Sequence, residues 1–189
     1  MARNDDRRRM LADAGLTVLA TDGARGLTHR AVDRVAEVPL GTTSNYFRNR
    51  SALVTGLVER IGERLAPDEE FLAERSGVEP SRALFAEYLR DIERRLMQNR
   101  TVTLALFELR LEAVRRPEVA ELLVPWRRQA FAGDVAFNAA AGLPGGERDI
   151  ALFHYAVDGL LFDRLTGPLE PDVPPARIID DLVDRLLPD

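Results

Sequence analysis

Cysteine is absent from this 189-residue sequence, and so is lysine. Without cysteine the chain has neither disulfides nor thiolate ligands, which excludes thiol catalysis and cysteine-based metal sites. No apolar run approaches the ~20 residues that a membrane-spanning helix requires. The first residues, MARNDDRRRML, contain no apolar signal segment, which predicts a cytoplasmic protein with no membrane partner.

Basic side chains are fewer than acidic ones, and the imbalance is uneven along the chain. The net charge of −5 argues against a protein that coats nucleic acid without specificity. Residues 1–50 hold nine arginines and six acids, whereas residues 51–189 hold seventeen arginines and twenty-five acids. This distribution is consistent with an N-terminal head that contacts phosphate and a larger body that does not.

The apolar residues recur with a helical period, and no segment alternates in the manner of a β-strand. We therefore predict an all-α fold. A kink or break is expected at Pro125, and the helix over 101–115 is apolar on most sides, which predicts a central position. The expected helices cover residues 3–21, 28–36, 40–47, 51–65, 81–98, 101–115, 117–141, 149–165 and 176–187.

Residues 28–50 predict two short helices separated by a tight turn. Thr28 is a favourable N-cap for the first helix, and Pro39 interrupts the helical pattern. On the second helix, Thr43 and Phe47 lie four residues apart on one face. The buried side of the first helix is expected to consist of Ala31, Val32, Val35 and Ala36. The polar side of the second helix carries Thr42, Ser44, Asn45 and Tyr46.

The polar side of this second helix suits a helix that reads DNA. A major groove admits one helix, and short polar side chains distinguish base edges. The helix carries no acid that phosphate would repel, and arginines flank the pair. Two helices that merely pack together remain the alternative at this point. The residues expected to contact DNA are Thr28, His29, Arg30, Thr42, Ser44, Asn45, Tyr46 and Arg50.

From Gly23 to Leu53 the sequence reads GARGLTHRAVDRVAEVPLGTTSNYFRNRSAL. It resembles the DNA-binding domain of the TetR (tetracycline repressor) family of bacterial transcription regulators, whose pattern is Gly, Leu-Thr, Ile/Val-Ala, Ala-Gly-Val, Gly-Thr, Tyr, Phe, Lys/Arg and Ala-Leu. The GTTSNYF stretch is similar to a large branch of that family. The resemblance implies a three-helix DNA-binding head with a helix-turn-helix over residues 1–49. A helical body over residues 50–189 would bind an effector and dimerise.

Three departures from the family pattern bear on the turn and on base recognition. Glu37 stands where Gly is frequent, and a left-handed conformation there costs Glu about 1 kcal/mol more than Gly, so we expect the turn to differ locally. Pro39 occupies a position that is often Ser. Ser44 and Tyr46 stand where Tyr and His are frequent, so the operator sequence of relatives does not carry over.

The last two predicted helices are unusually apolar. Faces this wide predict burial against a second copy of the chain, in a C2 interface formed by residues 149–165 and 176–187. An intrachain core is the alternative. The resemblance implies the same homodimer, whose paired heads would read a palindromic operator in double-stranded DNA.

Groups suited to catalysis or metal binding are sparse. His154 and Asp158 lie four residues apart on one predicted helix and could touch one metal ion or form a base–orienter pair. No third ligand, nucleophile motif or phosphate-binding glycine loop accompanies them. We predict no enzyme activity, no cofactor and no metal. An all-helical enzyme or small-molecule carrier with a site near this pair is the alternative.

The resemblance implies a small-molecule pocket inside the body, whose ligand would move the helix over 51–65 and the two heads. We thus predict a ligand-responsive homodimeric repressor, with a DNA-binding dimer that lacks an effector still open. Arg110 could equally pair with an acid such as Glu108. The candidate effector-binding residues are large or polar side chains in otherwise apolar helices, namely Tyr88, Phe107, Arg110, Trp126 and His154.

Overall fold

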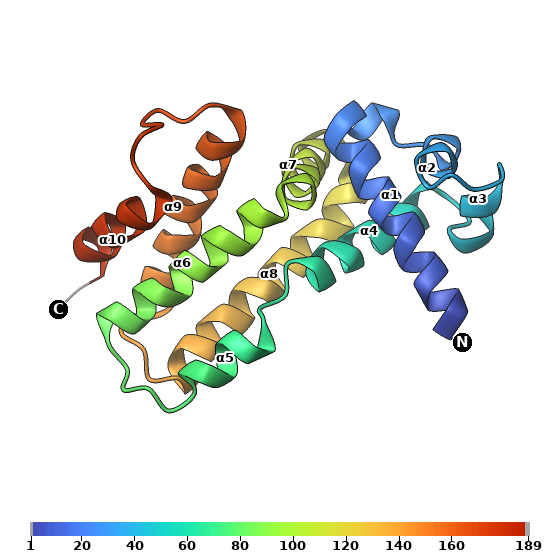
Figure 1. The fold of residues 1–189 in the computed structure, drawn as a ribbon. Coiled ribbons are helices and arrows are strands. Elements are labelled where there is room, and N and C mark those ends of the chain that lie inside the picture. The colour runs from blue at the N-terminus through green and yellow to red at the C-terminus, as the bar shows by residue number, and fades with distance from the viewer. Residues whose placement is uncertain (1, 188–189) are drawn as a thin grey trace. The chain divides into compact units, whose positions relative to one another are not determined.

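The computed structural model describes residues 2–187, and these form ten helices and no strand, which confirms the all-α prediction. The helices are α1 (Ala2–Gly26), α2 (His29–Val35), α3 (Thr42–Tyr46), α4 (Arg50–Arg64), α5 (Glu69–Arg75), α6 (Arg82–Gln98), α7 (Arg100–Arg115), α8 (Pro117–Ala140), α9 (Glu147–Thr166) and α10 (Pro175–Leu186) (Figure 1). They fall into two compact units. Unit 1 comprises Met1–Ala66 and Asn99–Arg127, and unit 2 comprises Pro67–Gln98 and Arg128–Asp189.

Unit 1 is built around α1, which packs against α2, α4 and α7 (Figure 1). The apolar residues of α1 and α4 face this core. Near the end of α1, Gly23 has φ 68° and kinks the helix, a conformation that favours glycine. Several large side chains in this core have an exposed fraction of 1% or less, namely Leu11, Leu16, Val18, Leu19, Leu53, Leu57, Ile61 and Leu109.

Two expectations for the middle of the chain are met in part. Helix α7 packs against α1 and α4 in unit 1 and buries Leu109 there, but it is not enclosed on all sides, because Leu111 and Val114 are 48% and 84% exposed. Helix α8 begins at Pro117 as expected and continues through Pro125, so the helix does not break there, and a kink at this residue stays a prediction. Proline removes a single backbone hydrogen bond, and the remaining bonds carry the helix past it.

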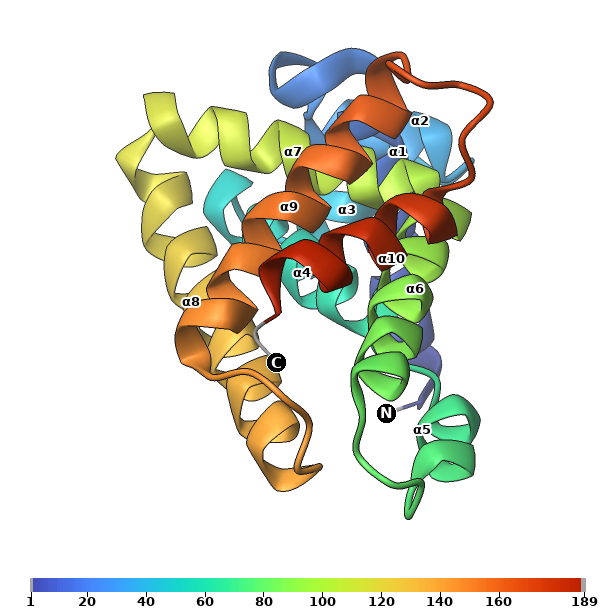
Figure 2. The same cartoon turned by 90° about the vertical axis from the view of Figure 1, so that its left-hand side faces the viewer.

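Unit 2 contains α5, α6, α9 and α10 together with the second part of α8. Helix α10 packs on α6 and α9, and α6 packs on α9 (Figure 2). Phe85 and Phe153 meet in this core with ring centroids 4.9 Å apart. Arg82 closes the end of α10 because its guanidinium donates to the carbonyl oxygens of Leu187 at 2.6 Å and Val183 at 3.0 Å.

Much of the apolar surface of α9 and α10 is already used inside unit 2. Phe153, Leu161, Ile179 and Val183 are at most 3% exposed. Not all of α9 is covered, however, because Tyr155 and Phe162 are 64% and 51% exposed. None of the helices in the described part of the chain has the length and apolar character needed to cross a bilayer.

Gly56 of α4 is the close-approach point for Phe47, and its replacement tests this packing. A Cβ at Gly56 would lie 2.3 Å from Phe47 Cε1, and the Phe47 ring is fully buried. We expect Gly56→Ala to lower the free energy of unfolding by about 1–3 kcal/mol, because overpacking outweighs the better helix propensity of alanine.

Gly133→Ala in α8 is the matched control for this measurement. A Cβ at Gly133 meets no atom within 4 Å, so the same substitution should be neutral or stabilise by up to about 1 kcal/mol. Chemical denaturation of both variants gives the comparison. Equal stabilities for the two would show that the Phe47 contact does not constrain the head.

Candidate nucleic-acid interface

The first helix of the motif starts as predicted. Thr28 has an extended backbone, and its Oγ1 accepts a hydrogen bond from the backbone N–H of Ala31 at 3.1 Å, which caps α2. Ala31 and Val32 are buried as expected. The prediction for Val35 is wrong, because this side chain is 39% exposed. Helix α2 has only two turns, and its third buried side chain is a carboxylate.

That carboxylate belongs to Asp33, which is fully buried and connects α2 to α3. Its Oδ1 accepts hydrogen bonds from the Thr43 hydroxyl at 2.5 Å and from the Thr43 backbone N–H at 2.7 Å. Its Oδ2 accepts from the backbone N–H of Gly41 at 2.7 Å. These backbone donors lie at the start of α3, so Asp33 satisfies them from a neighbouring helix in place of a local cap.

The charge of Asp33 is favoured in the folded chain. Burial by itself raises the pKa of this carboxyl group, but the hydrogen bonds from Thr43 and Gly41, together with the charge of His29, outweigh burial and lower the pKa below 3.8. Sequence reasoning missed Asp33. The available signal was the family pattern itself, which has Ala after Ile/Val where this chain has Asp33 after Val32.

The turn between the helices contains two left-handed residues. Glu37 has φ 53° and Gly41 has φ 91°. The expected local change at Glu37 is therefore wrong: the chain keeps the left-handed conformation and bears its cost of about 1 kcal/mol. Gly41 precedes α3 with no side-chain cap, which is why the carboxylate of Asp33 matters there.

Phe47 and Thr43 form the buried side of α3, as predicted, and both are fully buried. The guanidinium carbon of Arg8 lies 4.7 Å from the centre of the Phe47 ring, a favourable cation–π distance. His29 Nε2 lies 2.6 Å from the Phe47 carbonyl oxygen. A carbonyl only accepts hydrogen bonds, so this ring nitrogen carries the proton.

The opposite side of α3 is polar and accessible. Ser44 and Asn45 are exposed, and Thr42 and Tyr46 are half-buried. The helix is shorter than expected, since it begins at Thr42 rather than near Leu40. Leu40 lies in the turn instead and is 77% exposed. The described residues of α3 include no acid.

The four arginines within residues 28–50 differ in their surroundings. Arg30, Arg34 and Arg48 are exposed. Arg50, predicted to contact DNA, donates from Nη1 to the Leu27 carbonyl at 2.5 Å and from Nη2 to the Ala24 carbonyl at 2.7 Å, and its contact with DNA stays a prediction. These carbonyls lie at the end of α1 and just beyond it, so Arg50 joins the start of α4 to α1.

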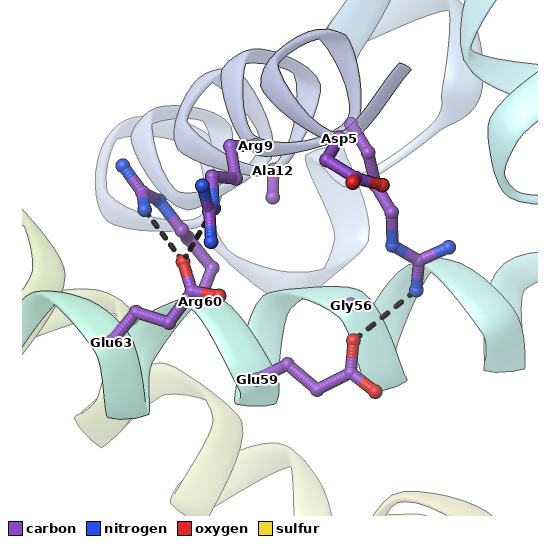
Figure 3. Close-up of a pocket in the computed structure, with 8 residues that line it drawn as sticks. Asp5, Arg9, Ala12, Gly56, Glu59, Arg60 and Glu63 are labelled. Atoms are coloured by element: carbon purple, nitrogen blue, oxygen red, sulfur yellow. Dashed lines mark hydrogen bonds and ion pairs between the residues drawn. The ribbon is translucent and has the colours of Figure 1, made fainter. Parts of the chain in front are cut away.

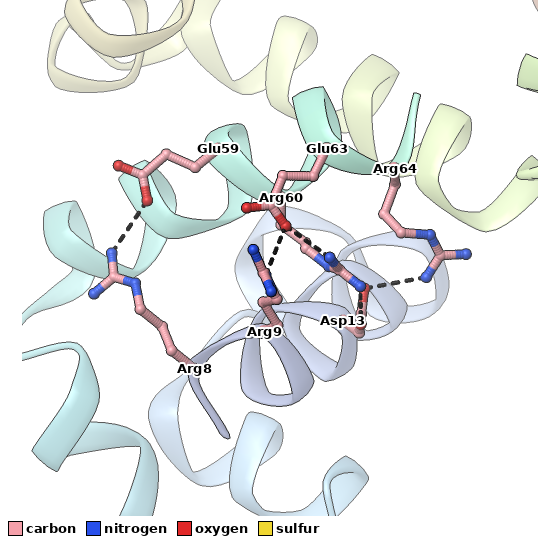
Figure 4. A network of polar contacts seen from close by, with 7 residues as sticks. All are labelled: Arg8, Arg9, Asp13, Glu59, Arg60, Glu63 and Arg64. Atoms are coloured by element: carbon pink, nitrogen blue, oxygen red, sulfur yellow. Dashed lines mark hydrogen bonds and ion pairs between the residues drawn. The ribbon is translucent and has the colours of Figure 1, made fainter. Parts of the chain in front are cut away.

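Ion pairs connect the length of α4 to α1 (Figure 4). Arg60 forms a bidentate pair with Asp13, in which Nε donates to Oδ1 at 2.9 Å and Nη2 donates to Oδ2 at 2.8 Å. Its Nη1 donates to Glu63 at 2.7 Å. The hydrogen bond to Asp13 raises the pKa of Arg60, and the bond from Arg60 lowers the pKa of Glu63. Arg8–Glu59 and Arg9–Glu63, both at 3.2 Å, extend the series.

A small pocket of about 200 Å³ opens beside these ion pairs, between α1 and α4 (Figure 3). Arg8, Arg9 and Arg60 all line it, and each pairs with an acid. Bidentate pairs such as Arg60–Asp13 hold their geometry better than single contacts between exposed charges. We interpret this pocket as part of the packing between two helices.

The profile of the tetracycline repressor-like C-terminal domain matches residues 80–189, more than half of the chain. The chain belongs to the TetR family. This match lies outside residues 23–53 and confirms the family resemblance that those residues carry. A search of curated proteins finds no match.

Solved TetR-family structures match the chain along nearly its full length. A TetR-family member from Streptomyces coelicolor A3 is 26% identical with a TM-score of 0.73, over 97% of this chain and 99% of that one. The multidrug binding protein EbrR, solved in complex with imidazole, is 28% identical with a TM-score of 0.67, over 97% and 96%. A transcriptional regulator from Rhodococcus sp. Rha1, 21% identical with a TM-score of 0.70 over 95% of each chain, shares the fold. These matches support a DNA-binding transcription regulator over the enzyme or carrier alternative.

In this TetR-family regulator the histidine of the alternative site pairs with an acid on another helix. His154 Nε2 contacts Asp134 Oδ2 at 3.0 Å, and its ring lies 5.3 Å from that of Phe131. Among the described residues no group of three metal-binding side chains converges. The structural neighbours are regulators rather than enzymes.

The five predicted effector residues fall in both units. Tyr88 and His154 lie in unit 2, where Tyr88 packs edge-on against Phe71 and Phe137. The other three are Phe107, Arg110 and Trp126, in unit 1. The Arg110 guanidinium lies 5.0 Å from the Phe107 ring centre. Their role in effector binding stays a prediction, as does the division of roles at residues 1–49 and 50–189.

Removing Asp33 tests whether it holds the motif together. We expect Asp33→Ala to lower the free energy of unfolding by about 1–3 kcal/mol, because the donors of Gly41 and Thr43 are left buried without an acceptor. Combining it with Thr43→Val should cost less than the sum of the two single changes, since fewer donors are stranded.

The pH dependence of the stability difference between the natural chain and an Asp33 variant shows whether Asp33 stabilises the fold through its charge or through its packing. A carboxyl group with a lowered pKa stabilises the fold above its ordinary value of 3.8 and loses that contribution as the pH falls through its folded-state pKa. The stability gap between the natural chain and Asp33→Asn should therefore close on acidification below about pH 4. A gap that is constant with pH would contradict this role.

Proposed function

We propose that this TetR-family chain is a ligand-responsive homodimeric repressor that binds a palindromic operator. The observation that carries the proposal is the geometry of α3: Asp33 and Phe47 hold it on its inner side, and its outer side is polar, accessible and free of acids. A helix that is fixed in this way can enter a major groove without losing conformational freedom on binding.

The side chains around α3 divide into base-reading and phosphate-binding groups. Ser44, Asn45 and Tyr46, with Thr42, would face base edges. Leu40, exposed in the turn, would contact a thymine methyl group or a sugar. Thr28 would donate its hydroxyl hydrogen to phosphate, because its oxygen already accepts from Ala31.

Arginines supply the non-specific part of the affinity. Arg30 and Arg48 are exposed at the two ends of the motif and would bind phosphates. We propose Arg48 as the main phosphate contact of this region, because the guanidinium of Arg50 is held by carbonyls of Ala24 and Leu27. His29 presents only Nδ1, which donates to phosphate when the ring is protonated.

The homodimer would form through α9 and α10. Tyr155 and Phe162, seven residues apart on α9, lie on one helical face and are more than half exposed. On α10, Ile178 and Leu182 are half-buried and four residues apart. Two copies related by a C2 axis would cover both stripes in one interface.

A small molecule would act through α4. EbrR, which is 26–28% identical to this chain, has been solved in complex with ethidium, proflavin and malachite green. We propose that this chain, like EbrR, has a body that binds a small molecule. Effector binding would tilt α4, and the Arg60–Asp13 contact would pass the tilt to α1. The operator affinity would fall because the ligand favours the other arrangement of the two heads.

Substitutions on α3 and beside it test DNA binding directly. Operator fragments are first selected with the purified natural chain. Tyr46→Ala should then cost about 1–3 kcal/mol of affinity for the selected sequence and relax its specificity. Arg48→Ala should weaken binding to all sequences alike and reduce the salt dependence by about one unit of slope.

Arg128→Ala serves as the control for these titrations, because Arg128 is exposed on α8, outside both the motif and the helices proposed for the homodimer. Fluorescence anisotropy over a range of salt concentrations measures all three variants. Binding of Tyr46→Ala with unchanged affinity and specificity would remove α3 from the interface.

A charge on the exposed face of α9 tests the homodimer. Tyr155→Glu should shift the natural dimer towards monomer at micromolar concentration, since an interface must bury this position without a partner charge. Val114→Glu on α7, at 84% exposure, makes the same change elsewhere and should leave the dimer intact. Sedimentation equilibrium measures the oligomeric state of both variants. If Tyr155→Glu remains a dimer, the interface lies on other helices.

A further inference from the structure

Leu40 lies in the turn between α2 and α3 (Figure 1), and its side chain is 77% exposed. A single exposed apolar side chain is common on protein surfaces and by itself indicates no contact. Two features set Leu40 apart. The backbone around it is held by several hydrogen bonds, and the turn leads directly into the helix that we propose to read DNA.

The backbone on both sides of Leu40 is restrained. The backbone N–H of Thr42 donates to the Pro39 carbonyl at 3.1 Å, and Gly41 has φ 91° and ψ −8°, which is the geometry of a type II β-turn with Leu40 as its second residue. The Thr42 hydroxyl donates to the same carbonyl at 2.6 Å, and the N–H of Gly41 donates to Asp33 Oδ2 at 2.7 Å. The leucine is therefore presented from an ordered backbone, so a contact through it costs little conformational entropy.

The chemistry of leucine limits what it can contact on DNA. Its side chain neither donates nor accepts hydrogen bonds, so it cannot bind phosphate or the polar atoms of a base edge. The C5-methyl group of thymine is the apolar group that the base edges present in the major groove. Residues at the N-terminal end of a recognition helix are the ones that contact base edges, and Leu40 precedes the first residue of α3 by two positions. This position favours a base edge over the deoxyribose of the DNA backbone.

We infer that Leu40 is a specificity-determining residue that contacts the C5-methyl group of a thymine in each half-site of the operator. The inference rests on the DNA binding proposed above, for which it names the base and the chemical group that the turn recognises. Thymine binds more tightly than uracil at this position, because its methyl group is removed from water against the leucine. Burial of one such group strengthens binding by about fourfold.

Replacement of thymine by uracil tests the contact, because it deletes the methyl group and leaves the hydrogen-bonding atoms of the base pair in place. An operator is selected with the full-length natural chain, and symmetric pairs of thymines are then replaced by deoxyuridine, one pair at a time. Fluorescence anisotropy should identify at least one pair whose replacement weakens binding by about fourfold for each half-site.

Variants then assign the methyl contact to Leu40. Leu40→Ala should bind the thymine and deoxyuridine forms of that pair with equal affinity, because its side chain is too short to reach the methyl group. Leu40→Met, which conserves the side-chain volume, should keep the preference for thymine. Val114→Ala truncates another exposed apolar side chain, at 84% exposure on α7, outside the motif and the helices proposed for the homodimer. This control should show the full preference of the natural chain.

Three results would overturn the inference and leave the proposed repressor in place. The first is specific binding with no thymine that is sensitive to replacement, and the second is a preference for thymine that Leu40→Ala retains in full. The third is a loss of affinity in Leu40→Ala that is the same for selected and unselected DNA, which would indicate a contact with the sugar. No sequence-specific binding by the natural chain to any fragment would instead overturn the proposed function, and this inference with it.

Discussion

The hydrogen bonds that Asp33 accepts at the start of α3 are the constraint on which the DNA-binding head depends. Helix α3 has five residues, far too few for a helix to be stable in isolation, and the glycine before it offers no side-chain cap. Its conformation is therefore imposed from outside. Asp33 holds its first turn, and Phe47, buried against Gly56 of α4, holds its last. The side that remains is the only one available to DNA.

Contacts between residues far apart in the chain also fix α4 against α1 in unit 1. Arg50 joins the start of α4 to the end of α1 through two carbonyl groups, and Arg60 joins the same two helices about one turn before α4 ends. A helix that is held along its length moves as a unit, because a tilt at one end cannot be absorbed by bending within it.

Periodicity and capping rules predicted most of the elements in this chain. Thr28 was assigned as a cap from its residue type and position, and Thr43 and Phe47 were assigned to one buried face from their spacing; both assignments are confirmed. Val35 followed the same apolar pattern as Val32, yet it is partly exposed. Apolar spacing reports which side chains share a face and does not report whether a neighbouring helix covers all of that face.

The sequence by itself determined the helical class, the approximate ends of the helices other than α5 and the place of the motif, because these depend on interactions between residues at most four positions apart. Only the tertiary structure decided that Asp33 completes the start of α3, that Arg50 is held by the end of α1, and that Arg60 pairs with Asp13 between α4 and α1. Asp33 acts across a turn, and the other two roles involve residues separated by tens of positions in the chain. Such contacts exist only once the helices have packed.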